Sequence, residues 1–168
     1  KSMKRGYTIE QYRKIVKKIN KKNPNISLTS DFIVGFPGET DKDFEETFAA
    51  IEEFKFDQSL FFAYSPRPGT PSSLIKDSVP KELKQKRLKK LLDLNKIHIT
   101  EHNLKLLDKE ELVIVEGQSK KNPKELFGRT SSNKIINFPG KISNIGKLVN
   151  VKINQLKTYT LSGFILGE

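Results

Sequence analysis

The residues best suited to bind a ligand stand in two short loops and beside a helix start. In the stretch at residues 31–40 (DFIVGFPGET), two glycines follow an apolar run, so the backbone can approach a ligand closely and offer N–H groups at the start of a helix. In the loop YSPRPGTP at residues 64–71, Arg67 can grip a carboxylate or phosphate with two hydrogen bonds, and Arg5 has the same ability near another helix start. An ordinary strand-to-helix turn and solvated loop arginines would give the same sequence, so the pattern alone leaves both interpretations open.

Composition limits the metal and thiol chemistry of these residues. The chain has no cysteine, so it cannot form a disulfide, a cysteine-ligated zinc site or an iron-sulfur site with its own side chains. His98 and His102 stand four residues apart, a spacing that can hold a metal on one helix, but no third ligand is apparent. We therefore expect surface or packed histidines, with no metal ligand and no catalytic residue in this chain.

The charge of the chain favours a negatively charged partner. Lysine and arginine number 31 against 20 aspartates and glutamates, which gives a net charge of +11. The excess lies in the second half, because residues 109–168 carry ten basic and five acidic residues whereas residues 1–78 carry 13 and 11. Such an excess is typical of proteins that bind nucleic acid or an acidic surface.

No apolar run approaches the length of about 18 residues that a spanning helix needs, and no signal peptide is apparent, so we expect a soluble, cytoplasmic protein without a membrane partner.

A small α/β unit is predicted to hold the two loops. A capping box that begins at Thr8, followed by apolar residues at helical spacing, predicts a helix over 8–22, and an apolar run predicts a strand over 26–34. A second helix that starts at Thr40 and a strand over 59–64 repeat the pattern. This order is typical of a parallel sheet with crossover helices, and such sheets bind ligands at the carboxyl ends of their strands.

The second half of the chain predicts a different architecture. A long helix over 80–107 begins at Pro80 and acts as a connector. Five short strands separated by turn residues then indicate a small antiparallel barrel of the kind that binds oligonucleotides. The strands are predicted at 112–116, 126–130, 135–138, 148–153 and 160–166. The predicted division is therefore 1–107, including the connector helix, and 108–168.

Five stretches, in this order, resemble the C-terminal part of the methylthiotransferase family of radical S-adenosylmethionine enzymes. They are MKRGYT (3–8), SDFIVGFPGET (30–40), YSPRPGTP (64–71), VEGQSKKNPKELFGRTSSNKIINFPG (115–140) and IGKLVNVKI (145–153). The resemblance implies an α/β fold that is part of a radical SAM (β/α) barrel. It also implies that an all-β TRAM domain follows, which is a small, OB-like, RNA-binding barrel.

The resemblance implies an enzyme activity of which this chain supplies only one part. Its relatives add a methylthio group to C2 of N6-isopentenyladenosine at position 37 of a tRNA, next to the anticodon, using S-adenosylmethionine and two 4Fe-4S clusters. The cysteines that hold those clusters are absent here, so we expect the chain to be inactive without the N-terminal part of such an enzyme. The implied cofactor contacts are Arg5, Ile33, Val34, Gly35 and Arg67. The candidate tRNA contacts, chosen by loop position and charge, are Lys120, Lys121, Arg129, Asn133, Lys134 and Phe138, the last as a stacking or packing residue.

Other substrates and a non-catalytic role are alternatives. The family member that acts on ribosomal protein S12 shares the barrel motifs, whereas the one that acts on threonylcarbamoyladenosine usually lacks the QSKK and SNKIINF loops in this form. A TRAM-type RNA-binding protein would need no cluster. The net charge of +5 over residues 109–168 favours an RNA substrate, while the two motif loops favour a cofactor beside them.

Two parallel strands taken from a barrel expose unpaired edges, so we also expect residues 1–78 to be unstable alone and residues 109–168 to fold independently.

Overall fold

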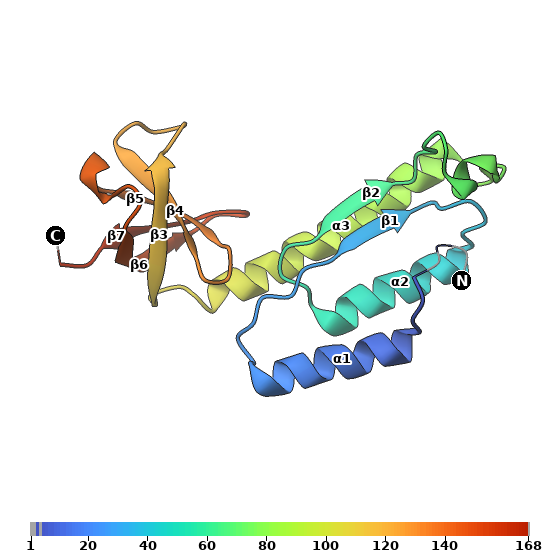
Figure 1. The fold of residues 1–168 in the computed structure, drawn as a ribbon, viewed down its shortest axis with the longest axis horizontal. Coiled ribbons are helices and arrows are strands. Elements are labelled where there is room, and N and C mark those ends of the chain that lie inside the picture. The colour runs from blue at the N-terminus through green and yellow to red at the C-terminus, as the bar shows by residue number, and fades with distance from the viewer. Residues whose placement is uncertain (1–2, 4, 168) are drawn as a thin grey trace.

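The computed structural model describes residue 3 and residues 5–167, and it shows an α/β unit and a β barrel connected by one long helix (Figure 1). The α/β unit contains α1 (Ile9–Lys22), β1 (Asp31–Val34), α2 (Asp41–Phe54) and β2 (Leu60–Ala63), and a short 3-10 turn η1 (Pro71–Leu74) follows β2. The connecting helix is α3 (Lys81–Leu104). No helix in the described part of the chain is long and apolar enough to cross a membrane.

The helix predicted over residues 8–22 is confirmed, whereas the first strand is shorter than predicted. The backbone N–H of Gln11 donates to Thr8 Oγ1 at 3.3 Å, and the Thr8 N–H donates to the Gln11 side chain at 2.9 Å, which is the predicted capping box. The ladder of β1 covers only Asp31–Val34 rather than 26–34. The preceding residues contact the loop before β2 instead, since the N–H of Asp57 donates to the carbonyl oxygen of Leu28.

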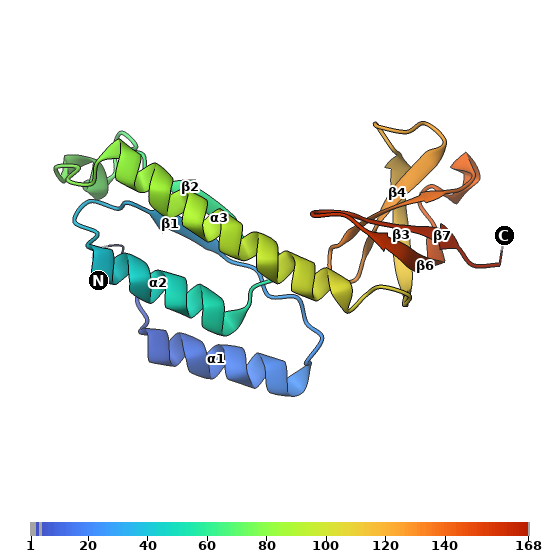
Figure 2. The ribbon, with the colours of Figure 1, turned by 180° about the vertical axis from the view of Figure 1, so that it is seen from behind.

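The two strands of the α/β unit are parallel, and α2 is their crossover, as predicted. One face of this sheet packs against α2 and α3, and Figure 2 shows α3 passing along the strands and on to the barrel. The core of that face consists of Val34, Phe44, Ile51, Leu91 and Leu94. The opposite face carries Ile33 beside Phe62, and the Phe62 side chain is 49% exposed. The sheet therefore has one covered face and one open apolar face.

The second unit is a closed five-stranded barrel, with the strand order β3-β4-β5-β7-β6. Its elements are β3 (Glu110–Gln118), β4 (Glu125–Thr130), β5 (Ile135–Pro139), η2 (Ile142–Asn144), β6 (Leu148–Leu156) and β7 (Leu161–Ile165). The alternate inward residues fill the interior, namely Val113, Val115, Leu126, Ile136, Phe138, Val151, Ile153 and Leu161. The small barrel is confirmed, but the all-antiparallel expectation is wrong at one position, because β7 returns alongside β5 in parallel and so closes the sheet.

Candidate functional site

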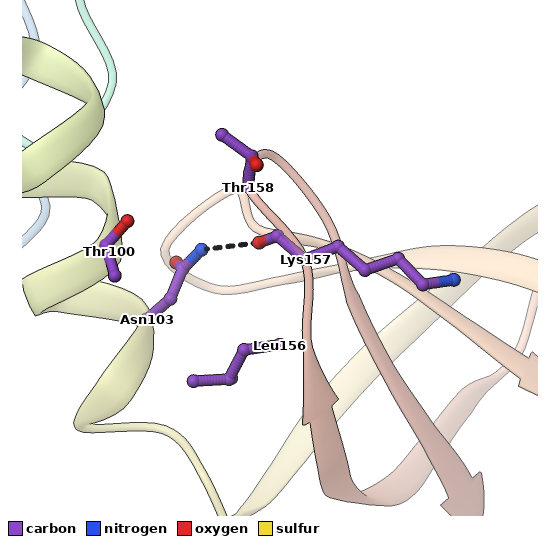
Figure 3. A pocket seen from close by; sticks show the side chains of 5 residues that line it. All are labelled: Thr100, Asn103, Leu156, Lys157 and Thr158. Carbon is purple, nitrogen blue, oxygen red and sulfur yellow. Dashed lines mark hydrogen bonds between the residues drawn. The ribbon is translucent and has the colours of Figure 1, made fainter. Parts of the chain in front are cut away.

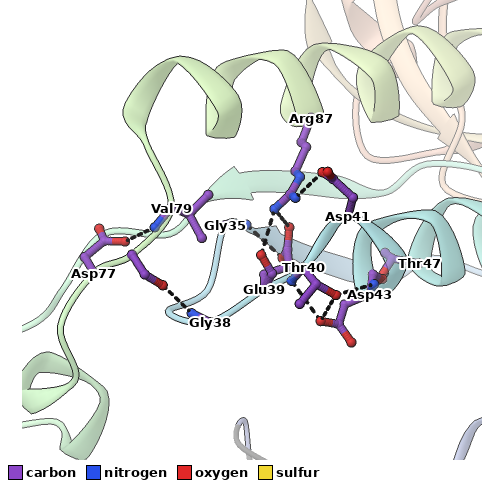
Figure 4. Close-up of polar contacts among 11 residues, drawn as sticks. Gly35, Gly38, Glu39, Thr40, Asp41, Asp43, Thr47, Asp77, Val79 and Arg87 are labelled. Carbon is purple, nitrogen blue, oxygen red and sulfur yellow. Dashed lines mark hydrogen bonds and ion pairs between the residues drawn. The ribbon is translucent and has the colours of Figure 1, made fainter.

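The glycine loop after β1 has a conformation that requires glycine at its first position. Gly35 has φ +72°, and a Cβ built there would lie 2.3 Å from Cγ of Lys84. The Gly35 N–H donates to Glu39 Oε2 at 2.8 Å. At the start of α2, the Thr40 N–H donates to Asp43 Oδ2 at 2.8 Å. The loop is thus folded around its own carboxylates (Figure 4).

Arg87 of α3 holds the same loop from the other side (Figure 4). Its side chain is 3% exposed, and its Nη1 donates to Glu39 Oε1 at 2.7 Å while its Nη2 donates to Asp41 Oδ1 at 2.7 Å. The carboxylate of Glu39 therefore bridges the backbone of Gly35 and the guanidinium of Arg87. Because these acidic side chains stand over the start of α2, the helix N-terminus is poorly suited to bind an anion. Sequence reasoning missed Arg87, since it lies 48 residues after its partner.

Lys84, one helical turn before Arg87, links the glycine loop to the loop after β2. Its ammonium group forms an ion pair with Asp77 and lies 5.2 Å from the centre of the Tyr64 ring. The hydrogen bond from Lys84 lowers the pKa of the Asp77 carboxyl group. The two loops predicted to meet at the carboxyl end of the sheet are therefore tied together by α3.

Four of the candidate cofactor residues, Ile33, Val34, Gly35 and Arg67, lie at or just after the carboxyl ends of β1 and β2, but they do not share one environment. Val34 is 1% exposed and points into the helix-covered core, so a side-chain contact between Val34 and a cofactor is wrong. Ile33 lies on the opposite, open face with Phe62, and Gly35 is covered by Lys84. Arg5 and Arg67 are exposed, and their guanidinium groups have no ion pair or hydrogen bond to any residue that the structure describes.

The barrel carries a surface groove of about 390 Å³ that brings three lysines together. Lys120 and Lys121 enter it from the turn between β3 and β4, and Lys157 enters it from the turn between β6 and β7. Its floor includes Phe127 and Asn137, which are paired across β4 and β5. Its remaining lining residues are Ser119, Glu125, Ile135 and Thr160. An aromatic ring among cations is a combination typical of sites that bind single-stranded nucleic acid.

The other candidate RNA contacts divide between the groove's neighbourhood and the interior. Arg129 lies opposite the groove residue Ile135 in the sheet, but its Nε is 3.0 Å from a Glu116 oxygen, and its Nη1 donates to Asn133 Oδ1 at 2.8 Å. Lys134 is 3% exposed and pairs with Asp57, so the prediction that its ammonium group contacts tRNA is wrong.

Phe138 is completely buried in the barrel core. Of the two roles predicted for Phe138, the structure therefore supports packing, and stacking on a base is wrong. Lys157, Phe127 and Asn137 were missed because the register of the barrel brings them to the groove from separate strands. The only sequence signal for them was the basic charge of this half of the chain.

The two histidines are packed rather than arranged around a metal. His98 is buried, and His102 Nε2 lies 2.7 Å from the carbonyl oxygen of Lys55. The described residues contain no group of three or more histidine, cysteine, aspartate or glutamate side chains that could hold a metal ion.

Comparison with protein families places both units in known classes. The Radical SAM superfamily model matches residues 1–51, and the TRAM domain model matches residues 105–166. The chain thus joins a radical SAM segment to a TRAM domain, and the all-β barrel described above lies within the TRAM match.

Three similar relatives carry the name tRNA-2-methylthio-N(6)-dimethylallyladenosine synthase. The chain is 47% identical to the protein of Nitrosomonas eutropha over 98% of its own length, and 50% identical to that of Buchnera aphidicola over 96%. It is 44% identical to that of Burkholderia mallei over 96%. The chain spans only 36% to 37% of the length of these relatives. The predicted resemblance to radical SAM methylthiotransferases is therefore confirmed.

Proposed function

We propose that this chain is the part of a tRNA methylthiotransferase that forms one side of the cofactor pocket and binds the tRNA. The whole enzyme adds a methylthio group to C2 of N6-isopentenyladenosine at position 37, in the cytoplasm, with the N-terminal part of such an enzyme as its partner. The observation that carries this proposal is the identity of 44% to 50% over nearly the whole chain, with both modules in one order.

The carboxyl end of the sheet fits S-adenosylmethionine in its chemistry. The open face with Ile33 and Phe62 suits the apolar faces of the adenine ring, and the unpaired guanidiniums of Arg5 and Arg67 suit the carboxylate of the methionine moiety. When it is bound beside a reduced iron-sulfur cluster, this cofactor supplies a 5′-deoxyadenosyl radical. The clusters themselves do not fit the residues present, because the chain has no cysteine.

The barrel groove suits the sugar-phosphate backbone and unpaired bases of an anticodon loop. Lys120, Lys121 and Lys157 line the groove together with Phe127, and Asn137 adds an amide that can donate and accept hydrogen bonds. The anticodon loop is single-stranded, and base stacking on an aromatic ring combined with phosphate contacts is a common way to bind such RNA.

A chimera tests the proposed activity. The matched segment of the Nitrosomonas eutropha relative is replaced by this chain, and 2-methylthio-N6-isopentenyladenosine is measured by mass spectrometry in tRNA from cells that lack their own enzyme. We expect the modified nucleoside to appear, and to disappear in the chimera with R67A. A folded chimera that binds its clusters but leaves the nucleoside unmodified would contradict the proposal.

RNA binding without chemistry is a second candidate, which the self-contained barrel and the missing cysteines favour. The same chimera separates the two. If the chain binds the anticodon stem-loop but the chimera makes no product, RNA binding alone is its function. Modification of ribosomal protein S12 or of threonylcarbamoyladenosine by the chimera would instead identify a different substrate.

A further inference from the structure

A buried ion pair joins the barrel to the α/β unit. Lys134, in the turn between β4 and β5, contacts Asp57 in the loop between α2 and β2, and their side chains are only 4% and 5% exposed. The second oxygen of Asp57 accepts a hydrogen bond from Ser27 Oγ at 2.8 Å. Both carboxylate oxygens are therefore used, and the pair links segments that are 77 residues apart.

The turn that carries Lys134 fixes where its ammonium group stands. The Thr130 N–H donates to the Lys134 carbonyl oxygen at 3.0 Å, and the Lys134 N–H donates to Thr130 Oγ1 at 3.1 Å. Asn133 occupies the left-handed region at φ 63°, which tightens the turn. The hairpin is thus a rigid support, and a change in the Lys134–Asp57 contact is a change in how the two units meet.

The other contacts at the junction are weaker or more exposed. Asn103 Nδ2 donates to the carbonyl oxygen of Lys157 at 3.5 Å (Figure 3). A cavity of about 290 Å³ lies between α3 and the turn after β6, so apolar packing does not fill the junction there. The ion pair between Lys55 and Glu101 joins the end of α2 to α3, is about half exposed at both side chains, and does not reach the barrel. We therefore expect the orientation of the barrel on the α/β unit to depend mainly on the ion pair between Lys134 and Asp57.

A buried ion pair is a poor source of stability, because removing two charges from water costs about as much as their attraction returns. Its best-attested value is to select one arrangement over its neighbours, because any displacement leaves a buried charge without a partner. We propose that Asp57 and Lys134 are positioning residues that fix the orientation of the TRAM barrel on the α/β unit. On the proposed function, this orientation sets the distance from RNA in the groove to the carboxyl ends of β1 and β2.

Distance measurements between two spin labels test the proposal directly. The chain has no cysteine, so K42C and K147C place single labels on exposed positions of α2 and the barrel without background. We expect one narrow distance distribution in the parent. Two variants replace the pair: D57L/K134M by apolar side chains, and D57N by a neutral amide of the same shape. We expect the distance distribution to become at least twice as wide in both variants. Circular dichroism checks that each variant is folded, and one folded variant is enough for the test.

A matched control separates orientation from general loosening. E53Q breaks the ion pair between Glu53 and Arg13, which are 2.6 Å apart on α2 and α1 within one unit, and it should leave the distribution narrow. A distribution in the folded pair variants as narrow as in the parent overturns the proposal. This outcome is independent of RNA binding, so it is distinct from failure of the proposed function.

The catalytic consequence is tested in the chimera. D57L/K134M should lower kcat at least tenfold while KM for tRNA stays within twofold, because the groove is intact but wrongly placed. An unchanged kcat would show that the orientation is not needed for the reaction. A proportional rise in KM alone would assign the pair to RNA affinity and would equally overturn the positioning role.

Discussion

The carboxyl end of the sheet and the outer face of the barrel use their charged residues in opposite ways. At the sheet, Glu39, Asp41 and Arg87 neutralise one another and satisfy the backbone of the glycine loop. At the barrel, the ammonium groups of Lys120 and Lys121 have no ion pair or hydrogen bond among the described residues. The first set therefore fixes the shape of the carboxyl end of the sheet, and the second set remains available to a ligand.

This contrast changes how the glycine motif is interpreted. Its acidic residues and glycines look like ligand contacts in the sequence, but in the structure they hold the loop in place against α3. On the proposed function, the groups left for a cofactor are Ile33 on the open apolar face and, outside the glycine loop, Arg5 and Arg67, whose guanidinium groups have no ion pair or hydrogen bond among the described residues. A sequence motif can thus mark a site without supplying its contacts.

The largest effect is expected from removing Arg87. R87M leaves the mostly buried carboxylate of Glu39 without its partner, and breaking a buried pair in this way costs about 3 to 5 kcal/mol of the free energy of unfolding. Urea denaturation measures this loss of unfolding free energy. The control is D41N, whose side chain is 88% exposed and whose loss should cost less than about 1 kcal/mol. If R87M were as stable as D41N, the claim that the sheet end is held by its internal network would fail.

A smaller effect separates the two glycines of the motif. G35A meets both a positive φ and the side chain of Lys84, so we expect a loss of about 2 to 3 kcal/mol. Gly38 has φ +86° with open space around it, so G38A should cost only about 1 kcal/mol. Thermal unfolding of the two variants gives the comparison, and equal losses would show that Lys84 moves aside freely.

The availability of the barrel lysines to a ligand is tested at the groove. K120A/K121A should weaken binding of an anticodon stem-loop about tenfold at low salt and reduce the slope of log K against log salt by about 1.4, since each single-strand phosphate contact contributes about 0.7. K17A/K18A, which removes two exposed lysines from α1, is the control with the same change in charge. Equal salt slopes in the two variants would mean that net charge, rather than the groove, attracts the RNA.

Local patterns in the sequence predicted elements better than contacts. The capping box at Thr8, the helix start at Thr40 and the long α3 follow from neighbouring residues, and all three are present. The parallel pairing of β1 and β2 also follows, because a crossover helix separates them. The length of β1 did not follow, since residues 26–30 are held by contacts with a loop about 30 residues away.

The residues of the candidate site were predicted correctly only where the amino-acid type alone indicated that the side chain is exposed. Lys120 and Lys121 line the groove, whereas Lys134, of the same type but in the turn between β4 and β5, is buried against a partner 77 residues away. The inward position of Phe138 depends on the strand register, and a shift by one residue would reverse it. Non-local pairing and register are therefore what the sequence alone could not supply.

The smallest expected effect concerns a buried group that is not satisfied internally. His98 is 3% exposed, and its Nδ1 has no hydrogen-bond partner within the described chain. Burial lowers the pKa of His98 below its ordinary value, with Glu101 opposing the shift and Lys55 adding to it. The unfolded chain therefore binds this proton more readily than the folded chain, so stability is complete above about pH 6.5 and falls as the pH drops toward and through the folded pKa.

We expect the parent to lose unfolding free energy between pH 7 and pH 5.5, by no more than about 1.4 kcal/mol per pH unit for one such group. Urea denaturation across this range measures the loss. H98Q should flatten the dependence, and H102Q, which alters a half-buried ring hydrogen-bonded to the carbonyl oxygen of Lys55, should retain it. The reverse result would contradict the assignment of the pH dependence to His98.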